Sequence, residues 1–183
     1  AAQGAERQKI MTSFGVMYQQ GALFGSMNLL DNVTLFMQEY TQLTESEMNL
    51  LARCKLDLVG LLPYESYMPS EISGGMPKRA AIARAMALDP KILFLDEPSA
   101  GLDPITSADL DRTILDLSKN LGITFVIVSH ELASIYAIAD KVIMLDKGAK
   151  GIIAEGDPKV LRDTSTDPRV HQFFNRIMSK DVA

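Results

Sequence analysis

The sequence predicts an α/β protein with a mainly parallel sheet, because short β-type runs alternate with longer helical runs along the chain. With 183 residues, 47% of them hydrophobic and 22% charged, the chain can bury one substantial core and a smaller appended lobe. Strands are predicted at residues 14–18, 92–95, 124–128, 141–145 and 152–154. The second and third are apolar on both faces, which is typical of a central parallel strand.

The region from residue 28 to residue 88 has a different character, because helical spacing replaces β-type alternation there. We expect it to be a helical lobe inserted into the sheet domain. Within it, Thr44 and Glu47 have the spacing of a capping box, which predicts a helix that ends at Gly60. The face expected to pack into the core consists of Met48, Leu51, Cys54 or Lys55, and Leu58.

Three further helix starts are predicted where an aspartate precedes a proline. The aspartate can cap the helix, and the fixed φ of proline suits the first turn. These pairs are Asp103–Pro104, Asp157–Pro158 and Asp167–Pro168.

An amphipathic stripe at i, i+3, i+4 and i+7 lies near the C-terminus. It consists of Val170, Phe173, Phe174 and Ile177. Most such stripes pack on their own domain, and contact with a partner subunit is the alternative.

Charge and composition narrow the possible ligands and the compartment. The net charge of −5 and the absence of a long basic run argue against nucleic acid. The lone cysteine, Cys54, excludes an internal disulfide and fits a reducing compartment, so we expect a cytosolic location. No apolar stretch is long enough to cross a bilayer and no signal-peptide pattern opens the chain, so we expect any membrane link to come through a partner.

The segment ISGGM, residues 72–76, brings a serine and two glycines to the start of a predicted helix. Backbone amides at a helix start, with no side chains over the glycines, make an anion site, and the Ser73 hydroxyl adds a donor. Phosphate is the expected ligand. An ordinary loop with a helix cap is the alternative for this segment taken alone.

An acid pair, Asp96 and Glu97, follows the predicted strand at 92–95. Open α/β sheets place their ligands at the carboxyl ends of strands. Such an aspartate can hold Mg²⁺ through water, and the neighbouring glutamate can orient or deprotonate the water that attacks a γ-phosphate. His130 ends another predicted strand at the same edge and can contact the same phosphate. A strand that ends in solvent and a structural histidine are the alternatives.

Five motifs, taken in order, resemble the ATPase subunit of ABC transporters. They are Gln19 in MYQQGALF, the ISGGM helix start, ILFLDE, SAGLD and IVSH. The likeness covers essentially the whole chain. The stretches ISGGMPKRAAIARAMALDP, GLDPIT and DPRVHQFFNRI look most like the subgroup that serves phospholipid or toluene-tolerance transport, the Mla type. The resemblance implies a P-loop NTPase-like parallel sheet core, here incomplete, with an inserted α-helical subdomain.

The resemblance also implies a role for each motif, with ATP and Mg²⁺ as cofactors. Gln19 is the Q-loop glutamine that senses Mg²⁺ and water, and Asp96 is the Walker B aspartate that holds the metal. Glu97 is the catalytic base, and His130 is the switch histidine. The nucleotide-contacting positions are Ser73, Gly74, Gly75 and Met76 of the signature, and Asp103 of the D-loop.

Two departures from the family pattern stand out. The usual signature is Leu-Ser-Gly-Gly-Gln, and Met76 here removes an amide that can bond the nucleotide sugar. In addition, the 183 residues contain no Gly-x-x-x-x-Gly-Lys-Ser/Thr loop. We therefore expect an N-terminally truncated fragment that does not hydrolyse ATP alone and that associates or swaps through apolar edges.

For the complete subunit the resemblance implies a head-to-tail pair of copies, in which Ser73 serves the nucleotide of its neighbour. It implies an integral membrane permease as partner, docked near Leu23, Phe24 and Met27, and a place on the inner face of the cell membrane. A plain connection between lobe and core is the alternative for these apolar residues. Small cytoplasmic and extracytoplasmic substrate-binding subunits are further partners that it allows, and nucleic acid is not among them.

The expected division of the chain follows from the motifs. Residues 1–27 and 89–163 form the incomplete ATPase core, residues 28–88 the signature subdomain, and residues 164–183 a helical tail. The expected function is an energy-coupling ATPase that powers transport of a lipid or hydrophobic substrate, and two other function classes are the alternatives. A soluble ABC-type ATPase acting on DNA or ribosomes normally brings coiled-coil insertions or basic surfaces. A nonhydrolytic interaction module would leave Glu97 and His130 idle.

Overall fold

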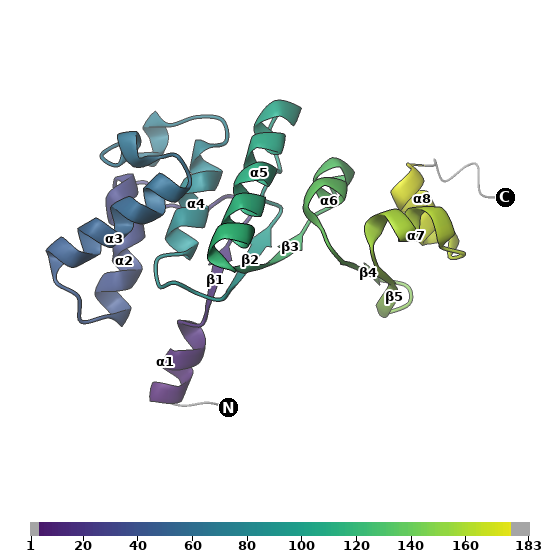
Figure 1. Cartoon of the computed structure of the whole chain (residues 1–183), viewed down its shortest axis with the longest axis horizontal. Coiled ribbons are helices and arrows are strands. Elements are labelled where there is room, and N and C mark those ends of the chain that lie inside the picture. The colour runs from purple at the N-terminus through teal and green to yellow at the C-terminus, as the bar shows by residue number, and fades with distance from the viewer. Residues whose placement is uncertain (1–3, 177–183) are drawn as a thin grey trace. The chain divides into compact units, whose positions relative to one another are not determined.

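The computed structural model describes residues 4–176, and the chain divides into two compact units, residues 1–129 and 130–183 (Figure 1). The elements of the first unit are α1 (Ala5–Met11), β1 (Phe14–Met17), α2 (Leu29–Tyr40), α3 (Glu45–Leu58), η1 (Leu62–Tyr64), η2 (Pro69–Glu71), α4 (Met76–Ala85), β2 (Ile92–Asp96), α5 (Pro104–Leu121) and β3 (Thr124–Val128). Those of the second unit are α6 (Leu132–Ile138), β4 (Val142–Asp146), β5 (Gly151–Gly156), α7 (Pro158–Thr164) and α8 (Pro168–Asn175).

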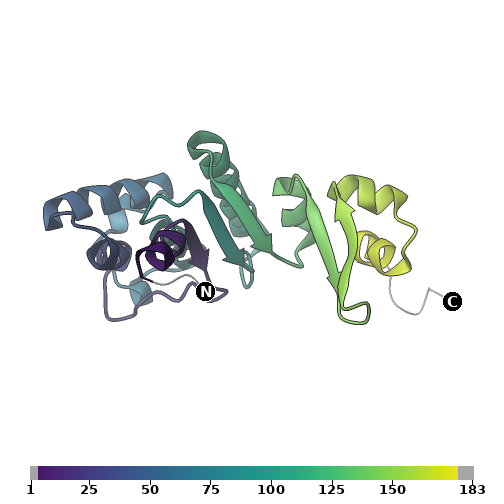
Figure 2. The same cartoon turned by 90° about the horizontal axis from the view of Figure 1, so that it is seen from below.

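The first unit is built on a parallel sheet in the order β1–β2–β3 (Figure 2). The register pairs Met17 with Leu95 and Asp96 with Val128, so the strands end together at one edge. The strands predicted from the sequence are confirmed to within one residue in this unit. The α/β class with a parallel sheet is likewise confirmed.

One face of this sheet is buried beneath helices. Met17, Leu93 and Leu95 are essentially inaccessible to solvent, and α4 contacts β1 while α5 contacts β3. Gly15 allows the close approach of β1 to α4, because a Cβ there would lie 2.1 Å from the Ala85 carbonyl oxygen. An alanine at this position would therefore separate the strand from the helix.

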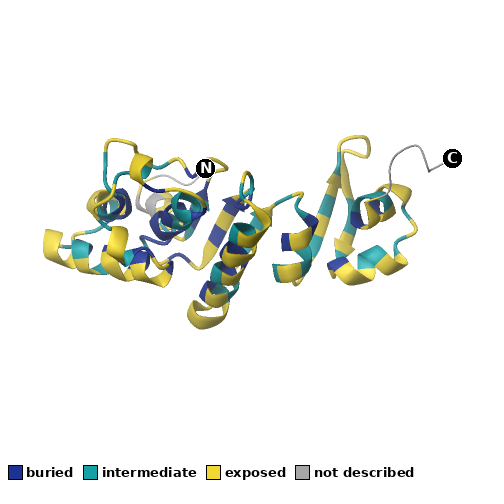
Figure 3. Cartoon of the chain, turned by 90° about the horizontal axis from the view of Figure 1, so that it is seen from above, coloured by how far each residue is buried: buried dark blue, intermediate teal, exposed yellow. Residues whose placement is uncertain are grey.

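The other face of the sheet contradicts the expectation that β2 and β3 are buried on both faces. Burial alternates along β2 (Figure 3). Phe94 of β2 is 40% exposed and Val128 of β3 is 61% exposed. The helices that contact β1 and β3 cover only the Leu93 side. Among residues 4–129 these strands are therefore half-covered, although their sequences are apolar throughout.

The helical part of the first unit consists of α2, α3 and α4, which pack on one another. The capping box at Thr44 and Glu47 is confirmed at the start of α3. The expected core face of α3 is confirmed at Met48 and, of the two alternatives Cys54 and Lys55, at Lys55, and Leu51 is half-buried, whereas Cys54 and Leu58 are exposed. The buried positions are Met48, Ala52, Lys55 and Leu56.

Lys55 can occupy the buried face of α3 because its ammonium has a partner. The chain turns at Asp89, which has a φ of +50°, and the Asp89 carboxylate forms an ion pair with the Lys55 ammonium. A buried charge of this kind requires a counter-charge. This pair ties α3 to the segment that leads into β2.

In the second unit, β4 and β5 form an antiparallel pair with an irregularity at Met144 and Leu145. Its core is formed by Leu132, Val170 and Phe174.

The predicted helix caps are confirmed in both units. Asp103, Asp157 and Asp167 accept hydrogen bonds from backbone amides at the starts of α5, α7 and α8.

The C-terminal stripe packs within its own unit. Val170 and Phe174 are buried in the core and Phe173 packs against them, whereas Ile177 lies outside the described residues. The Tyr136 hydroxyl donates a hydrogen bond to the Phe174 carbonyl, 3.0 Å away, and fixes α8 further. Across residues 4–176, none of the helices has both the length and the apolar character that a membrane span requires.

Candidate nucleotide site

The carboxyl edge of the parallel sheet brings together three of the predicted site residues. Asp96 ends β2 and is exposed, Glu97 follows it, and Gln19 lies two residues after the end of β1. Because the strands are parallel and in register, these groups meet at one edge. This edge offers carboxylate and amide oxygens, which suit a hard cation such as Mg²⁺ held through water.

Glu97 has a backbone conformation that its residue type disfavours. Its φ is +46°, in the left-handed region, where a non-glycine residue is strained. The Glu97 amide donates to the Val128 carbonyl at 2.9 Å, and its own carbonyl accepts the Ala100 amide at 3.1 Å. The side chain is partly buried, and its Oε2 is shielded from solvent. The fold therefore holds this carboxylate in place through the β2–β3 pairing.

The signature loop precedes α4 and exposes its first donors. Ser73 and Gly74 are exposed, and Gly74 has a φ of +59°, which favours glycine. Ile72 is largely buried and anchors the loop. Gly75 is the N-cap of α4, and a Cβ there would meet Thr106 Cγ2 at 2.7 Å. The signature loop thus packs directly against the start of α5.

Asp103 of the predicted D-loop is the N-cap of α5. Its carboxylate accepts the amides of Ile105 and Thr106 at 3.0 and 3.1 Å, together with the Thr106 hydroxyl. These hydrogen bonds, first of all the one from the Thr106 side chain, lower the pKa of Asp103 below its usual value. The structure thus gives this carboxylate a role in fixing the turn that precedes α5.

Lys78 is a neighbour of the site that the sequence reasoning missed. It lies in the first turn of α4, and its ammonium donates to the Gln19 carbonyl. Burial lowers the pKa of Lys78, while attraction to Asp96 and Glu97 acts in the opposite direction. A signal was present in the sequence, because Lys78 is one helical turn after Ser73 and Gly74 and is the first cation that follows the predicted phosphate loop.

The chemical roles of the predicted site residues remain predictions. His130 begins the second unit, apart from the sheet that carries Asp96. Within the described residues, no cluster of three or more acidic, histidine or cysteine side chains forms a ready-made metal cage. The donor set at the sheet edge fits a cation that keeps most of its waters, as Mg²⁺ does beside a nucleotide.

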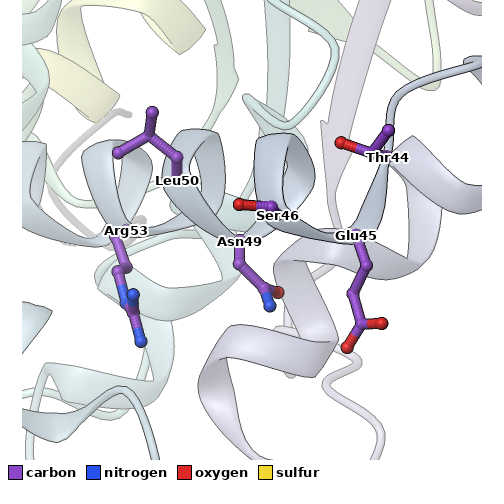
Figure 4. A pocket seen from close by; sticks show the side chains of 6 residues that line it. All are labelled: Thr44, Glu45, Ser46, Asn49, Leu50 and Arg53. Carbon is purple, nitrogen blue, oxygen red and sulfur yellow. The ribbon is translucent and has the colours of Figure 1, made fainter.

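A hollow on the helical part of the first unit lies apart from these residues. It is lined by the outer side of α3 and its cap, namely Thr44, Glu45, Ser46, Asn49, Leu50 and Arg53 (Figure 4). The Thr44 hydroxyl and the Arg53 guanidinium are already bonded to Glu47 and Glu65. None of the predicted site residues lines this hollow.

Open α/β sheets bind ligands at the carboxyl ends of their strands, and Gln19, Asp96 and Glu97 lie at that edge here, so the fold and the site together define an α/β protein with a ligand site at the sheet edge. Residues 2–100, more than half of the chain, match the family described as ABC transporter. The chain therefore belongs to the ABC transporter family.

Curated relatives match nearly the whole chain. The probable ribonucleotide transport ATP-binding protein mkl of Mycobacterium leprae is 45% identical over 170 residues, which are 93% of this chain and 48% of that protein. The intermembrane phospholipid transport system ATP-binding protein MlaF of Escherichia coli strain K12 is 43% identical over 167 residues, 91% of this chain and 61% of that protein. The chain thus spans about half to three-fifths of the length of these relatives.

Solved structures give the same fold. The ATP-binding cassette MJ0796, in a dimeric post-hydrolysis state bound to ADP and Pi, superposes with a TM-score of 0.72 at 27% identity, covering 85% of this chain and 68% of that one. The protein cbiO1 of Clostridium perfringens, part of the transporter complex cbiONQ, gives 0.74 at 28% identity, covering 92% and 69%. The expected ABC ATPase fold is therefore confirmed.

Proposed function

We propose that this chain is part of the ATP-binding and ATP-hydrolysing subunit of an ABC transporter that moves a lipid or another hydrophobic substrate through a membrane permease. The observation that carries the proposal is the edge of the parallel sheet, where Gln19, Asp96 and the strained Glu97 lie together. Family membership and the resemblance to a phospholipid-transport relative support it.

The roles we assign follow from chemistry and position. Asp96 binds a water of the metal ion, and Gln19 offers an amide oxygen to the same cation. Bound Mg²⁺ supplies positive charge that offsets the charge of the β- and γ-phosphates. Glu97 orients the attacking water and accepts its proton. His130 contacts the γ-phosphate, and its proximity to this site is part of the proposal.

The signature loop has a different role in the proposed assembly. Ser73 and Gly74 are exposed at the start of α4 and present a hydroxyl and amides to solvent. We assign these donors to the phosphates of a nucleotide held mainly by a second copy, with Gly75 and Met76 completing the loop. Asp103 fixes the turn beside them. The head-to-tail dimer of two such subunits is therefore the working unit.

The triphosphate also needs a loop that these 183 residues do not contain. The Gly-x-x-x-x-Gly-Lys-Ser/Thr pattern, whose amides and lysine hold the β- and γ-phosphates, is absent from the sequence. A complete ATP site therefore needs this loop from other residues. We infer that residues 1–183 alone do not hydrolyse ATP at a measurable rate.

The remaining partners are proposed from the same family role. The permease is expected to contact the exposed side of the segment after Gln19, where Phe24 is 47% exposed. This docking places the subunit on the inner face of the cell membrane. Small cytoplasmic and extracytoplasmic subunits complete the proposed complex.

The test of hydrolysis uses the complete subunit assembled with its permease. Glu97→Gln is expected to lower kcat for ATP by at least about 100-fold, because it removes a general base. Glu39→Gln, a matched change at an exposed position of α2, is expected to leave kcat unchanged. Equal kcat values for Glu97→Gln and the wild type would remove Glu97 from the proposed chemistry.

The substrate class needs a separate experiment, because one relative is named for phospholipid and another for ribonucleotide transport. The complex in proteoliposomes is given fluorescent phospholipid in one arm and radiolabelled ribonucleotide in the other. We expect ATP-dependent movement of the phospholipid only. Movement of the ribonucleotide alone would contradict the lipid assignment and leave the ATPase proposal standing.

A further inference from the structure

Two cations of α4 hold the loop that follows β1. The Lys78 ammonium donates to the Gln19 carbonyl, and the Arg84 guanidinium donates to the carbonyls of Gly21, at 2.9 Å, and Ala22. Arg84 is almost fully buried. The loop from Gln19 to Ala22 is therefore attached to α4 at two points about two helical turns apart.

The conformation of this loop explains why it needs such attachment. Gly21 and Ala22 have φ values of +75° and +51°, and the left-handed region is unfavourable for alanine. The Gly21 amide donates to the Tyr18 carbonyl at 2.7 Å and closes the turn. Without the two cations, this turn would lose the donors that satisfy its outward carbonyls.

The two attachments differ in their surroundings. The Arg84 guanidinium lies 5.9 Å from the centres of both the Phe24 and the Phe36 rings, where cation–π attraction supports it. Lys78 is half-buried instead, and its ammonium donates to the backbone of Gln19, a residue that we assign to the metal. The anchor at Arg84 is thus structural, whereas the anchor at Lys78 acts on a residue of the site.

We propose that Lys78 is a positioning residue that holds Gln19 at the sheet edge. This inference rests on the proposed function, because that function gives Gln19 its role at the metal. Removal of Lys78 takes away the side-chain donor to the Gln19 carbonyl and therefore loosens the loop from Gln19 to Ala22.

The experiment uses the chain of residues 1–183 and the variants Lys78→Met, Lys78→Arg and Lys119→Met. Lys119 is exposed in the last turn of α5, so its replacement is a matched loss of charge away from the site. Hydrogen exchange of the Gly21 amide, which closes the turn, is measured by NMR.

We expect Lys78→Met to speed Gly21 exchange by about tenfold, because the loop opens more often when one of its two anchors is lost. Lys78→Arg keeps the exchange rate near that of the wild type, because it restores a donor, and Lys119→Met leaves the rate unchanged. Unchanged Gly21 exchange in Lys78→Met, or equal acceleration in Lys119→Met, would overturn the inference. The exchange rate does not depend on ATP hydrolysis, so failure of the proposed function would leave this result standing.

Discussion

The replacement Gly75→Ala tests the contact between the signature loop and the start of α5. Gly75 has a φ of −78°, which alanine adopts freely, so backbone strain is not the issue. The added Cβ would lie 2.7 Å from Thr106 Cγ2. Thr106 cannot simply rotate away, because its hydroxyl and its amide both donate to Asp103.

The expected magnitude follows from two opposing effects. Overpacking of a fixed contact costs about 1–3 kcal/mol. Alanine also restricts the unfolded chain and returns about 0.4–1 kcal/mol. We therefore expect Gly75→Ala to lower the free energy of unfolding by about 1–2 kcal/mol. Thr106→Ser removes Cγ2 and keeps the hydroxyl, so in that background Gly75→Ala should be neutral or stabilising.

The assay is urea unfolding of the four proteins of this double-mutant cycle, followed by tyrosine fluorescence. Four of the five tyrosines lie in residues 1–129, and the chain has no tryptophan, so the signal reports mainly on the first unit. A loss of 1–2 kcal/mol moves the midpoint by roughly 0.5–1 M urea. An equal cost of Gly75→Ala with Thr106 and with serine at that position would refute the contact as the cause.

Three other changes test the structure. Asn32→Ala should destabilise the first unit by about 2–4 kcal/mol, because the fully buried Asn32 amide makes four hydrogen bonds to backbone groups. Urea unfolding measures this loss of stability. Asp89→Ala should cost about 1–3 kcal/mol by leaving the buried Lys55 ammonium without its carboxylate, whereas Lys55→Met should change stability by less than about 1 kcal/mol. Hydrogen bonds from Arg169 lower the pKa of Asp167 to about 2, so the stability this cap provides is complete above about pH 4 and is lost as the pH falls through 2. An NMR titration of the Arg169 amide should show a midpoint near 2, and Asp167→Asn should abolish the transition.

Much of the fold follows from local sequence patterns. The alternation of apolar runs and helical segments is sufficient to predict the strands, and Asp-Pro pairs predict the starts of α5, α7 and α8. These features depend on backbone chemistry within a few residues of one another. The exposed face of β2 could not be predicted in this way, because Phe94 and Ile92 are apolar whether or not a helix covers them.

The site was predictable only in part for a related reason. Asp96, Glu97 and Gln19 end strands or follow them closely, so a parallel sheet brings them to one edge. Burial of Arg84 was not predicted, and that of Lys55 was predicted only as an alternative to Cys54, because charged residues are seldom buried without partners and their partners lie far along the chain. The place of Lys78 just after the phosphate loop was a local signal, but its contact with Gln19 joins residues 59 positions apart and could not be predicted from neighbouring residues.

At Glu97, the side chain proposed for catalysis lies on a backbone conformation that lowers the stability of the fold. Glycine would relieve the unfavourable φ and, by that alone, relax this corner of the protein. The backbone hydrogen bond to the neighbouring strand holds Glu97 in this conformation. Replacing Glu97 with glycine should therefore remove the backbone strain at this turn and, with it, the proposed catalytic base, as is expected wherever a reactive group is held in a strained conformation.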